Sequence, residues 1–244
     1  MKVRRHAAQG RLGPRVRVRP WAFDDRVVQV ALADQAIVPT SDEVRGWVDA
    51  LAAGDLHAIR TGALFPEAAK SFTAAGFAVI DTLALLRADL GDVRRLAPAP
   101  TVRLTARRLH EASVVDRAAF GDPWGNEASD LADIRRATPI HRSRARLAGA
   151  DGFRRSLVAF AISGAAAGQG YLQRLAVAPE HQGRGHGRAL VVDALAWMTA
   201  RRLSHALVNT AVGNSAALGL YESQGFHRLP EHLVVMQLDL EAVR

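Results

Sequence analysis

The chain has 244 residues, 49% hydrophobic and 23% charged, so it can bury the core of one large domain or two small ones. It contains no cysteine, which excludes disulfides, Cys-ligated zinc, iron–sulfur clusters and a thiol nucleophile. The formal net charge is +8, but residues 1–19 hold seven Lys or Arg and no acidic residue, so the rest of the chain is nearly neutral.

The N-terminal sequence bears on location and partners. The basic segment 1–20 lacks the apolar core of a secretory signal, and no apolar stretch in the chain is long enough to span a membrane. We therefore expect a soluble, cytoplasmic protein with no membrane partner. The arginines are weak evidence for nucleic acid, which we expect as a partner only through the basic tail; a solvated appendage is the alternative.

The first third predicts two helices and a strand. Thr40 and Glu43 have the spacing of a capping box, which indicates a helix from about residue 41 to 53 that Gly54 ends. A strand up to Thr61 and a second helix follow. Residues 96–100, rich in Pro and Ala, predict a linker to the second half.

The second half alternates strands and helices. Residues 143–149 and 153–163 flank a turn signal at 150–152 and predict a β-hairpin. A Gly/Ala-rich loop is expected over 164–170, then a strand over 171–178. Apolar residues at helical spacing predict a helix from about 185 to 203.

The C-terminal region predicts a strand over 205–212 and a short helix to residue 224. Asn214 is the expected N-cap of this helix, and Gly225 stands at its C′ position. Residues 226–229 and 233–240 predict a terminal strand pair around a turn at 230–232. The pattern as a whole is α/β with an antiparallel flank.

A shift of 149 residues aligns part of the first third with this C-terminal region without a gap. The matches are Thr61 with Thr210, Ala68 with Ala217, Phe72 with Tyr221, Gly76 with Gly225 and Phe77 with Phe226. The shared strand–helix–Gly-Phe–strand order suggests a duplicated unit. Upstream, residues 37–39 resemble 177–179, but the Gly-rich turn that follows 179 is missing after 39. We expect the first copy to be structural, with core residues Leu64, Phe72, Phe77, Leu83 and Leu85.

The Gly-rich turn is the segment 182–188, Gln-Gly-Arg-Gly-His-Gly-Arg, between a strand and a helix. Its glycines let the backbone approach a ligand, and a helix N-terminus favours an anion. The Gly-Lys-Ser/Thr of a nucleoside triphosphate loop is absent, as is the acidic residue of a dinucleotide fold. The turn predicts a phosphate or diphosphate ligand; a plain strand-to-helix turn is the alternative.

Two motifs together carry a family resemblance. The pattern Gln182-x-x-Gly185-x-Gly187, followed about thirty residues later by Asn214…Ala217…Leu220-Tyr221…Gly225-Phe226, resembles the GNAT superfamily of acyl-CoA-dependent N-acetyltransferases. The resemblance spans about residues 101–240 and, in degenerate form, 16–90. The segment 120–124, Phe-Gly-Asp-Pro-Trp, is similar to the ribosomal-protein N-terminal acetyltransferase type.

The resemblance implies the fold and the domain organisation. We expect an α/β chain, an α+β mixed sheet of the GNAT-like acyl-CoA N-acyltransferase fold, with a degenerate N-terminal half-repeat. The expected segments are a basic tail at 1–15, a degenerate half domain without cofactor loop at 16–95, a linker at 96–100 and a catalytic GNAT domain at 101–244.

The resemblance also implies acetyl-CoA as co-substrate. The N–H groups of turn 182–188 would bind its pyrophosphate, and residues 175–177 would be a splayed sheet edge that binds pantetheine, with the Leu175 N–H polarising the thioester carbonyl. Asn214 would bond the pantetheine arm or a water, besides capping its helix. The cofactor site thus comprises Leu175, Val177, Gln182, Gly183, Arg184, Gly185, His186, Gly187, Arg188 and Asn214.

Tyr221 is the expected catalytic residue, a general acid that protonates the departing thiolate. The alternative is a core aromatic, as Phe72 is in the first copy. The general base stays open among Glu127, Glu231, His232 and water, because residues 169–174 contain no carboxylate. His186 and His205 are expected to be a loop and a strand residue, and no metal site is expected.

The leading hypothesis is an enzyme that transfers an acetyl group from acetyl-CoA to a primary amine, of a small molecule or a protein N-terminus, by direct attack. Residues 120–140 and the turn at 230–232 would shape the acceptor site. The second hypothesis is a non-catalytic acyl-CoA-binding regulatory protein with a basic docking tail, and the third a nucleic-acid-associated protein. The intact Tyr221 favours the enzyme, and the tail lacks the aromatic residues of a nucleic-acid surface.

Overall fold

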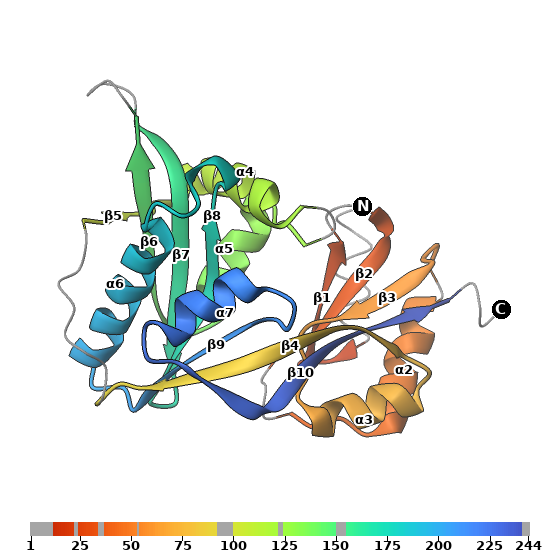
Figure 1. Ribbon diagram of the computed structural model, residues 1–244. Coiled ribbons are helices and arrows are strands. Elements are labelled where there is room, and N and C mark those ends of the chain that lie inside the picture. The colour runs from red at the N-terminus through yellow and green to blue at the C-terminus, as the bar shows by residue number, and fades with distance from the viewer. Residues whose placement is uncertain are drawn as a thin grey trace. The chain divides into compact units, whose positions relative to one another are not determined.

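The computed structural model describes residues 12–21, 24–33, 37–52, 54–91, 100–121, 124–149 and 155–240. The chain divides into two compact units, each shown with its labelled elements in Figure 1. The first unit comprises residues 1–85, 211–213 and 229–244, and the second comprises 86–210 and 214–228. Tail residues 1–11, linker residues 92–99 and the hairpin turn at 150–154 lie outside the described ranges.

The second unit is a sheet with helices before and after its central strands, in the strand order β9-β8-β7-β6-β5. Its elements are β5 (Val102–Arg103), η1 (Ala106–Arg108), α4 (Leu109–Phe120), α5 (Ala128–Arg136), β6 (Ile140–Ala148), β7 (Ser156–Ala166), β8 (Gln169–Val177), η2 (Pro179–His181), α6 (His186–Ala200), β9 (His205–Ala211) and α7 (Ser215–Glu222). The pairs β5–β6, β6–β7 and β7–β8 are antiparallel, whereas β8 and β9 are parallel.

The first unit has a sheet in the order β1-β2-β3-β10-β4. Its elements are β1 (Val16–Trp21), β2 (Asp24–Leu32), α2 (Ser41–Ala52), β3 (Ala58–Thr61), α3 (Pro66–Ala74), β4 (Ala78–Asp89) and β10 (His227–Asp239), the last two with residues in both units. β1 and β2 are antiparallel, β2 and β3 parallel, and β3 and β10 antiparallel. The mixed sheets with interspersed helices confirm the predicted α/β class.

Each unit has its own apolar core. In the first unit Trp47 of α2, Ile59 of β3 and Phe72 of α3 pack with Met236 of β10. In the second unit α4 and α5 cover one group of β7 and β8 side chains, including Phe160 and Ile162. Four of the five core residues predicted for the first copy are buried; Leu83 is half-buried. No helix in the described ranges is both long and apolar enough to cross a bilayer.

The predicted loop over 164–170 is wrong. β7 continues to Ala166 and β8 begins at Gln169, joined by Ala167 and Gly168 with φ of 48° and 76°. Two consecutive positive φ values are the geometry of a tight hairpin turn. The glycines have another cause: a Cβ on Gly164 would overlap Thr138 and one on Gly170 would overlap Met198. They mark close packing on the strands rather than a loop.

The predicted terminal strand pair is also wrong, because β10 runs unbroken from His227 to Asp239. Pro230 lies in its exposed first half, while the ladder with β3 involves Gln237, Leu238 and Asp239. A proline is tolerated in a strand where its missing N–H is not needed by a neighbour. Residues 229–240 group with the first unit, whereas the sequence analysis places them with the second.

The segments aligned by the 149-residue shift fold alike. α3 begins at Pro66 and α7 at Ser215, and the glycines that follow, Gly76 and Gly225, have φ of 91° and 88°. The Phe77 N–H donates to the Phe72 carbonyl at 3.1 Å, and its counterpart Phe226 N–H donates to the Tyr221 carbonyl at 3.2 Å. The paired rings have centroids 5.2 Å apart in the first copy and 5.8 Å in the second.

Candidate active site

The Gly-rich turn leads from η2 into the N-terminus of α6. Gly183 and Gly185 have φ of 71° and 79°, in the left-handed region that side chains other than glycine rarely adopt. Gly187 is constrained by packing, since a Cβ there would lie 3.1 Å from Leu220 of α7. Gly185 is the N-cap, and no side chain caps the helix. The N–H groups of the first turn are therefore open to an anion.

Other side chains of the turn divide into two groups. Arg184 and Arg188 are exposed. Gln182 instead fastens the turn to β8, because its side-chain amide donates to the Val177 carbonyl at 3.2 Å. The turn therefore offers two free cationic groups beside its backbone N–H groups.

His186 is held at the start of α6 by neighbours from β6 and η2. The Arg146 Nε donates to His186 Nδ1 at 3.3 Å, and the His181 ring stands edge-on with centroids 5.9 Å apart. Burial, followed by the charge of Arg146, lowers the pKa of His186. The imidazole is thus neutral at physiological pH and accepts a hydrogen bond. The expectation that His186 is a loop residue is wrong, because it is the first residue of α6.

The sheet opens beside this turn. β8 pairs with β7 as far as Val177, but its ladder with β9 comprises only Gly170–Ala206 and Tyr171–Leu207. The two strands diverge beyond these pairs (Figure 1). Leu175 and Val177 therefore lie on a strand segment whose β9 side has no ladder partner, which is where the sequence places the splayed edge.

Asn214 and Tyr221 lie on the helix after β9. The Asn214 Oδ1 accepts the Ala217 N–H at 3.1 Å, which confirms the predicted N-cap. Tyr221 is only 5% exposed. Burial raises the pKa of Tyr221 to about 12, and the charge of Arg174 acts in the opposite direction. The phenol therefore stays protonated at physiological pH and is available as a proton donor.

A charged network beside Arg174 was not found from the sequence. The guanidinium of Arg174 donates from Nε and Nη2 to the carboxylate of Asp116, both at 2.7 Å, and Asp116 is fully buried. The one available signal was a charged residue within the apolar pattern of α4, next to Val115.

The candidates for the general base differ in their exposure and in the hydrogen bonds and ion pairs that they already form. Glu127 caps α5 and also forms an ion pair with Arg117 at 2.8 Å. Glu231 and His232 are exposed on β10, among the residues that group with the first unit.

His205 begins β9, and burial lowers its pKa. Among the described residues, no three His, Asp or Glu side chains form a group that could share a metal ion.

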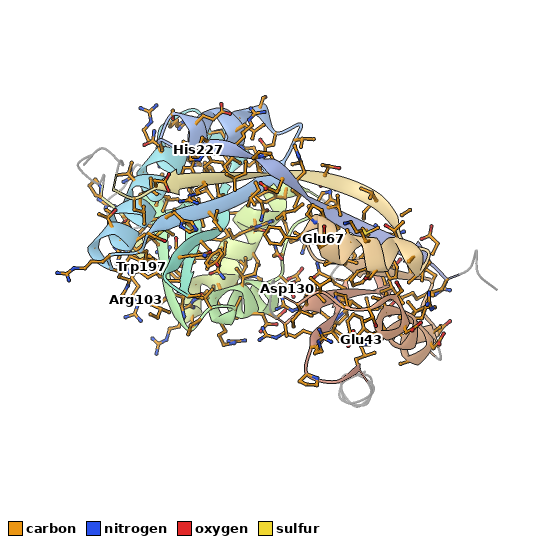
Figure 2. All side chains as sticks on the ribbon, turned by 90° about the horizontal axis from the view of Figure 1, so that it is seen from below. Glu43, Glu67, Arg103, Asp130, Trp197 and His227 are labelled. Atoms are coloured by element: carbon orange, nitrogen blue, oxygen red, sulfur yellow. The ribbon has the colours of Figure 1, made fainter. Side chains whose placement is uncertain are left out.

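In the first unit, the helix that corresponds to α6 is α2, and side chains occupy the N–H groups at its N-terminus. At the N-terminus of α2 the Glu43 carboxylate accepts the Thr40 N–H at 2.8 Å, and Thr40 Oγ1 accepts the Glu43 N–H at 3.2 Å. This confirms the predicted capping box. Glu43, labelled in Figure 2, also forms an ion pair with Arg15. A carboxylate thus lies at the first turn of α2, where α6 leaves its N–H groups open.

Comparisons with known proteins add the family context. Residues 117–226 match the model of the Acetyltransferase (GNAT) family. The mycothiol acetyltransferase of Acidothermus cellulolyticus is 44% identical over 52 residues, which are 21% of this chain and 16% of that protein. The chain therefore matches less than a fifth of that relative's length.

Two solved structures extend the comparison. A GCN5-related N-acetyltransferase from Sphaerobacter thermophilus matches with a TM-score of 0.61 at 13% identity, over 92% of this chain and 76% of that one. The ribosomal-protein-S18-alanine N-acetyltransferase of Escherichia coli matches with a TM-score of 0.47 at 23% identity, over 58% and 93% of the two chains. At 13% identity, the likeness to the Sphaerobacter thermophilus structure shows a shared fold and no more.

Proposed function

We propose that the chain is an acetyl-CoA-dependent N-acetyltransferase, because its residues 117–226 match the model of the GNAT family, which uses acetyl-CoA as co-substrate on amine acceptors. The acetyl group goes to a primary amine of a small molecule or a protein N-terminus, by direct attack. Residues 182–188, with Leu175, Val177 and Asn214, form the co-substrate site, and Tyr221 is the general acid.

One observation carries this proposal: the uncapped N-terminus of α6, preceded by two left-handed glycines, lies next to the unpaired segment of β8. The first element suits a diphosphate, because its N–H groups and the helix dipole favour an anion. The second suits an extended amide-containing arm, because an unpaired strand edge offers N–H and C=O groups at regular spacing. Acetyl-CoA contains both groups in series.

The remaining groups supply the chemistry. The Leu175 N–H donates to the thioester carbonyl oxygen and stabilises the charge that develops there. The amine nitrogen forms the new C–N bond as the C–S bond breaks, and the Tyr221 hydroxyl gives its proton to the leaving sulfur. The proton lost by the amine passes to water or to an acceptor side chain; an N-terminal α-amine, with a pKa of about 8, needs only a weak base.

The experiment is an amine panel. Peptides with free N-termini, polyamines and aminoglycosides are mixed with acetyl-CoA, and release of free coenzyme A is followed for the full chain. We expect release with at least one amine class, and intersecting double-reciprocal lines when amine and acetyl-CoA are varied together. Parallel lines would indicate an acyl-enzyme and contradict direct attack.

The panel also distinguishes the proposed enzyme from a regulatory protein that binds acyl-CoA without catalysis. That protein would bind acetyl-CoA with the same affinity but release no coenzyme A with any amine. Tyr221→Phe serves as the matched control, because it keeps the ring that packs on Phe226 and removes only the hydroxyl. Release that does not depend on this hydroxyl would remove Tyr221 from the mechanism.

A further inference from the structure

A buried ion pair joins α4 to β8 in the second unit. Both carboxylate oxygens of Asp116 accept from Arg174, and the Arg174 guanidinium lies 3.6 Å from the centre of the Phe120 ring. The Arg174 side chain is 18% exposed and that of Asp116 is 0% exposed. A pair of this kind costs desolvation and is a weak source of stability, so its partners indicate what else it does.

The same pair binds the segment 124–127, which directly precedes α5. Arg174 Nη2 donates to the Trp124 carbonyl at 2.9 Å. Asp116 Oδ2 accepts both the Asn126 backbone N–H at 2.7 Å and its side-chain amide at 3.1 Å. Arg174 and Asp116 thus each form a hydrogen bond to the backbone of this short segment, besides their bonds to one another.

Packing fixes the segment from the other side. A Cβ on Gly125 would lie 2.8 Å from Cγ and 2.9 Å from Cα of Arg117 on α4, so only glycine fits here. Arg117 also pairs with Glu127. The segment 124–127 is therefore clamped between α4 and the Asp116–Arg174 pair, although it has no regular secondary structure.

The pair also lies next to the proposed reaction site along β8. The register of β7 and β8 shifts so that Ile162 faces Arg174 and Ser163 faces Leu172, which leaves Gln173 as an extra residue in a bulge. Bulges re-aim the side chains that follow them. Arg174 comes directly after the bulge and directly before Leu175, whose N–H is assigned to the thioester carbonyl.

We propose that Arg174 and Asp116 are positioning residues for the acceptor amine: they hold the segment 124–127, which belongs to the region 120–140 expected to shape the acceptor site, at a fixed distance from β8. The proposal rests on the proposed function. It predicts that loss of the pair weakens use of the amine while the Gly-rich turn still binds acetyl-CoA.

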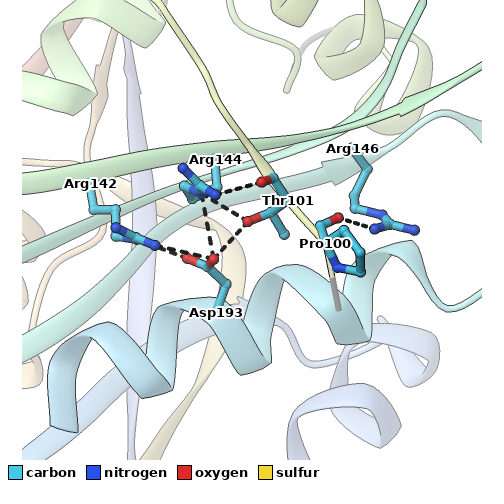
Figure 3. Close-up of polar contacts among 6 residues, drawn as sticks. All are labelled: Pro100, Thr101, Arg142, Arg144, Arg146 and Asp193. Atoms are coloured by element: carbon cyan, nitrogen blue, oxygen red, sulfur yellow. Dashed lines mark hydrogen bonds and ion pairs between the residues drawn. The ribbon is translucent and has the colours of Figure 1, made fainter. Parts of the chain in front are cut away.

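A second ion pair whose carboxylate is buried provides a comparison; its Arg142 side chain is 35% exposed. On α6, Asp193 Oδ1 accepts from Arg142 Nε at 2.8 Å, and its Oδ2 accepts from Thr101 Oγ1 at 2.7 Å (Figure 3). Its side chain is 8% exposed. This pair joins α6 to β6 and to residue 101 and makes no contact with the segment 124–127. Its loss should lower stability without changing use of the amine.

The test compares double variants, because replacing both members of a buried pair by apolar residues avoids an unpaired buried charge. Arg174→Met with Asp116→Leu should retain the dissociation constant of acetyl-CoA within about twofold and raise the KM of the amine on the order of tenfold or more, the scale of a lost charge-assisted hydrogen bond. Arg142→Met with Asp193→Leu should leave both constants unchanged. The full chain is used, with the amine identified by the panel.

Two further variants guard against a folding artefact. Gly125→Ala displaces the segment without altering a charge and should raise the amine KM in the same direction. Arg174→Lys keeps the charge but cannot form both bonds to Asp116, and should fall between wild type and the double variant. Circular dichroism and melting temperature are recorded for each protein.

The outcomes separate this inference from the proposed function. An unchanged amine KM in both the Arg174/Asp116 variant and Gly125→Ala, in folded proteins, overturns the positioning role and leaves the proposed function intact. A matching rise in the Arg142/Asp193 variant also overturns it, since the effect would then follow general stability. A wild-type chain that transfers no acetyl group to any amine overturns both.

Discussion

At the scale of single residues, the comparison of Tyr221 with Phe72 isolates one hydroxyl group. Both rings are buried, both stand next to a phenylalanine, and both residues accept the N–H of that phenylalanine. The packing therefore needs only the aromatic ring. What the second copy adds is a hydroxyl proton, in a buried setting that raises the pKa of Tyr221 to about 12.

Tyr221→Phe should lower turnover on the order of 10²-fold, the usual scale for losing a positioned acid. The melting temperature and the acetyl-CoA affinity should stay nearly constant, because the ring is kept. The measurement is steady-state kinetics with a productive amine, alongside calorimetric titration of acetyl-CoA. Wild-type turnover in this variant would return Tyr221 to the role that Phe72 has.

Asp193 gives a prediction about pH and stability. Burial alone would raise the pKa of Asp193, but hydrogen bonds from Arg142 and Thr101 outweigh it and lower the pKa below the ordinary 3.8. A lowered carboxyl pKa contributes stability that is fully present above the ordinary value and is lost as the pH falls through the lowered one.

Asp193→Asn should therefore cost on the order of 3 kcal/mol in the free energy of unfolding near pH 7. That cost should shrink as the pH falls through the lowered pKa of Asp193, because the wild-type carboxyl is then itself protonated. Urea denaturation over a descending pH series measures the difference. A loss that stays constant over the whole series would show that the charge of Asp193 does not stabilise the fold.

At the scale of the elements, helix N-termini distinguish the two copies more clearly than their strands do. α2 begins with a complete capping box, and α7 begins with an Asn214 cap. α6 has no side-chain cap, and neither do α3 and α4, but of these three helices α6 alone begins directly after two left-handed glycines. The open N-terminus that follows the Gly-rich turn is the one assigned to a ligand.

Asn214→Ala should cost roughly 1 kcal/mol of stability, the usual value of an N-cap. If Asn214 also bonds the pantetheine arm, acetyl-CoA affinity should fall as well. Asn214→Ser is the matched control, because serine caps a helix but is too short to retain the amide contacts. Equal acetyl-CoA affinity in wild type, Ala and Ser variants would limit Asn214 to its capping role.

The same elements show what could be predicted from sequence. Local signals were sufficient for the capping box at Thr40 and Glu43, the N-cap at Asn214, and the strands and helix around the Gly-rich turn, because each depends on neighbouring residues. Gly164 and Gly170 suggested a loop, but they are strand residues that pack closely on Thr138 and Met198. Pro230 suggested a turn, but it lies in β10 away from the ladder with β3. The Asp116–Arg174 pair, 58 residues apart, needed the fold to be recognised.

At the scale of the whole molecule, the C-terminal strand β10 contributes residues to both units. Met236, Leu238 and Leu240 follow the residues 117–226 that match the GNAT family model, yet they belong to the apolar core with Ile59 and Phe72. Among the described residues after 100, that core contains side chains of β10 and of Leu240 alone. We therefore expect the first copy to be required for the stability of the chain.

A fragment of residues 100–244 should expose these three side chains and aggregate. Size-exclusion chromatography and binding of a hydrophobic dye compare it with the full chain. Replacing Leu238 and Leu240 by Lys in the fragment should restore part of its solubility, because it removes apolar area that no longer has a partner. A monomeric, fully active unmodified fragment would contradict the structural role of the first copy.

The central claim is that the chain has one acetyl-CoA site, at the Gly-rich turn, and that acetyl transfer depends on it. Calorimetric titration of acetyl-CoA and transfer to a productive amine test it together in wild type, Gly185→Asp and Gly185→Asn. Both side chains have room at this position, and Asn tolerates the left-handed φ of 79°. We predict one site per chain in wild type, weakened binding with Asn, and neither binding nor transfer with Asp, whose charge repels the diphosphate. Two sites in wild type, or full binding and transfer in Gly185→Asp, would contradict the account.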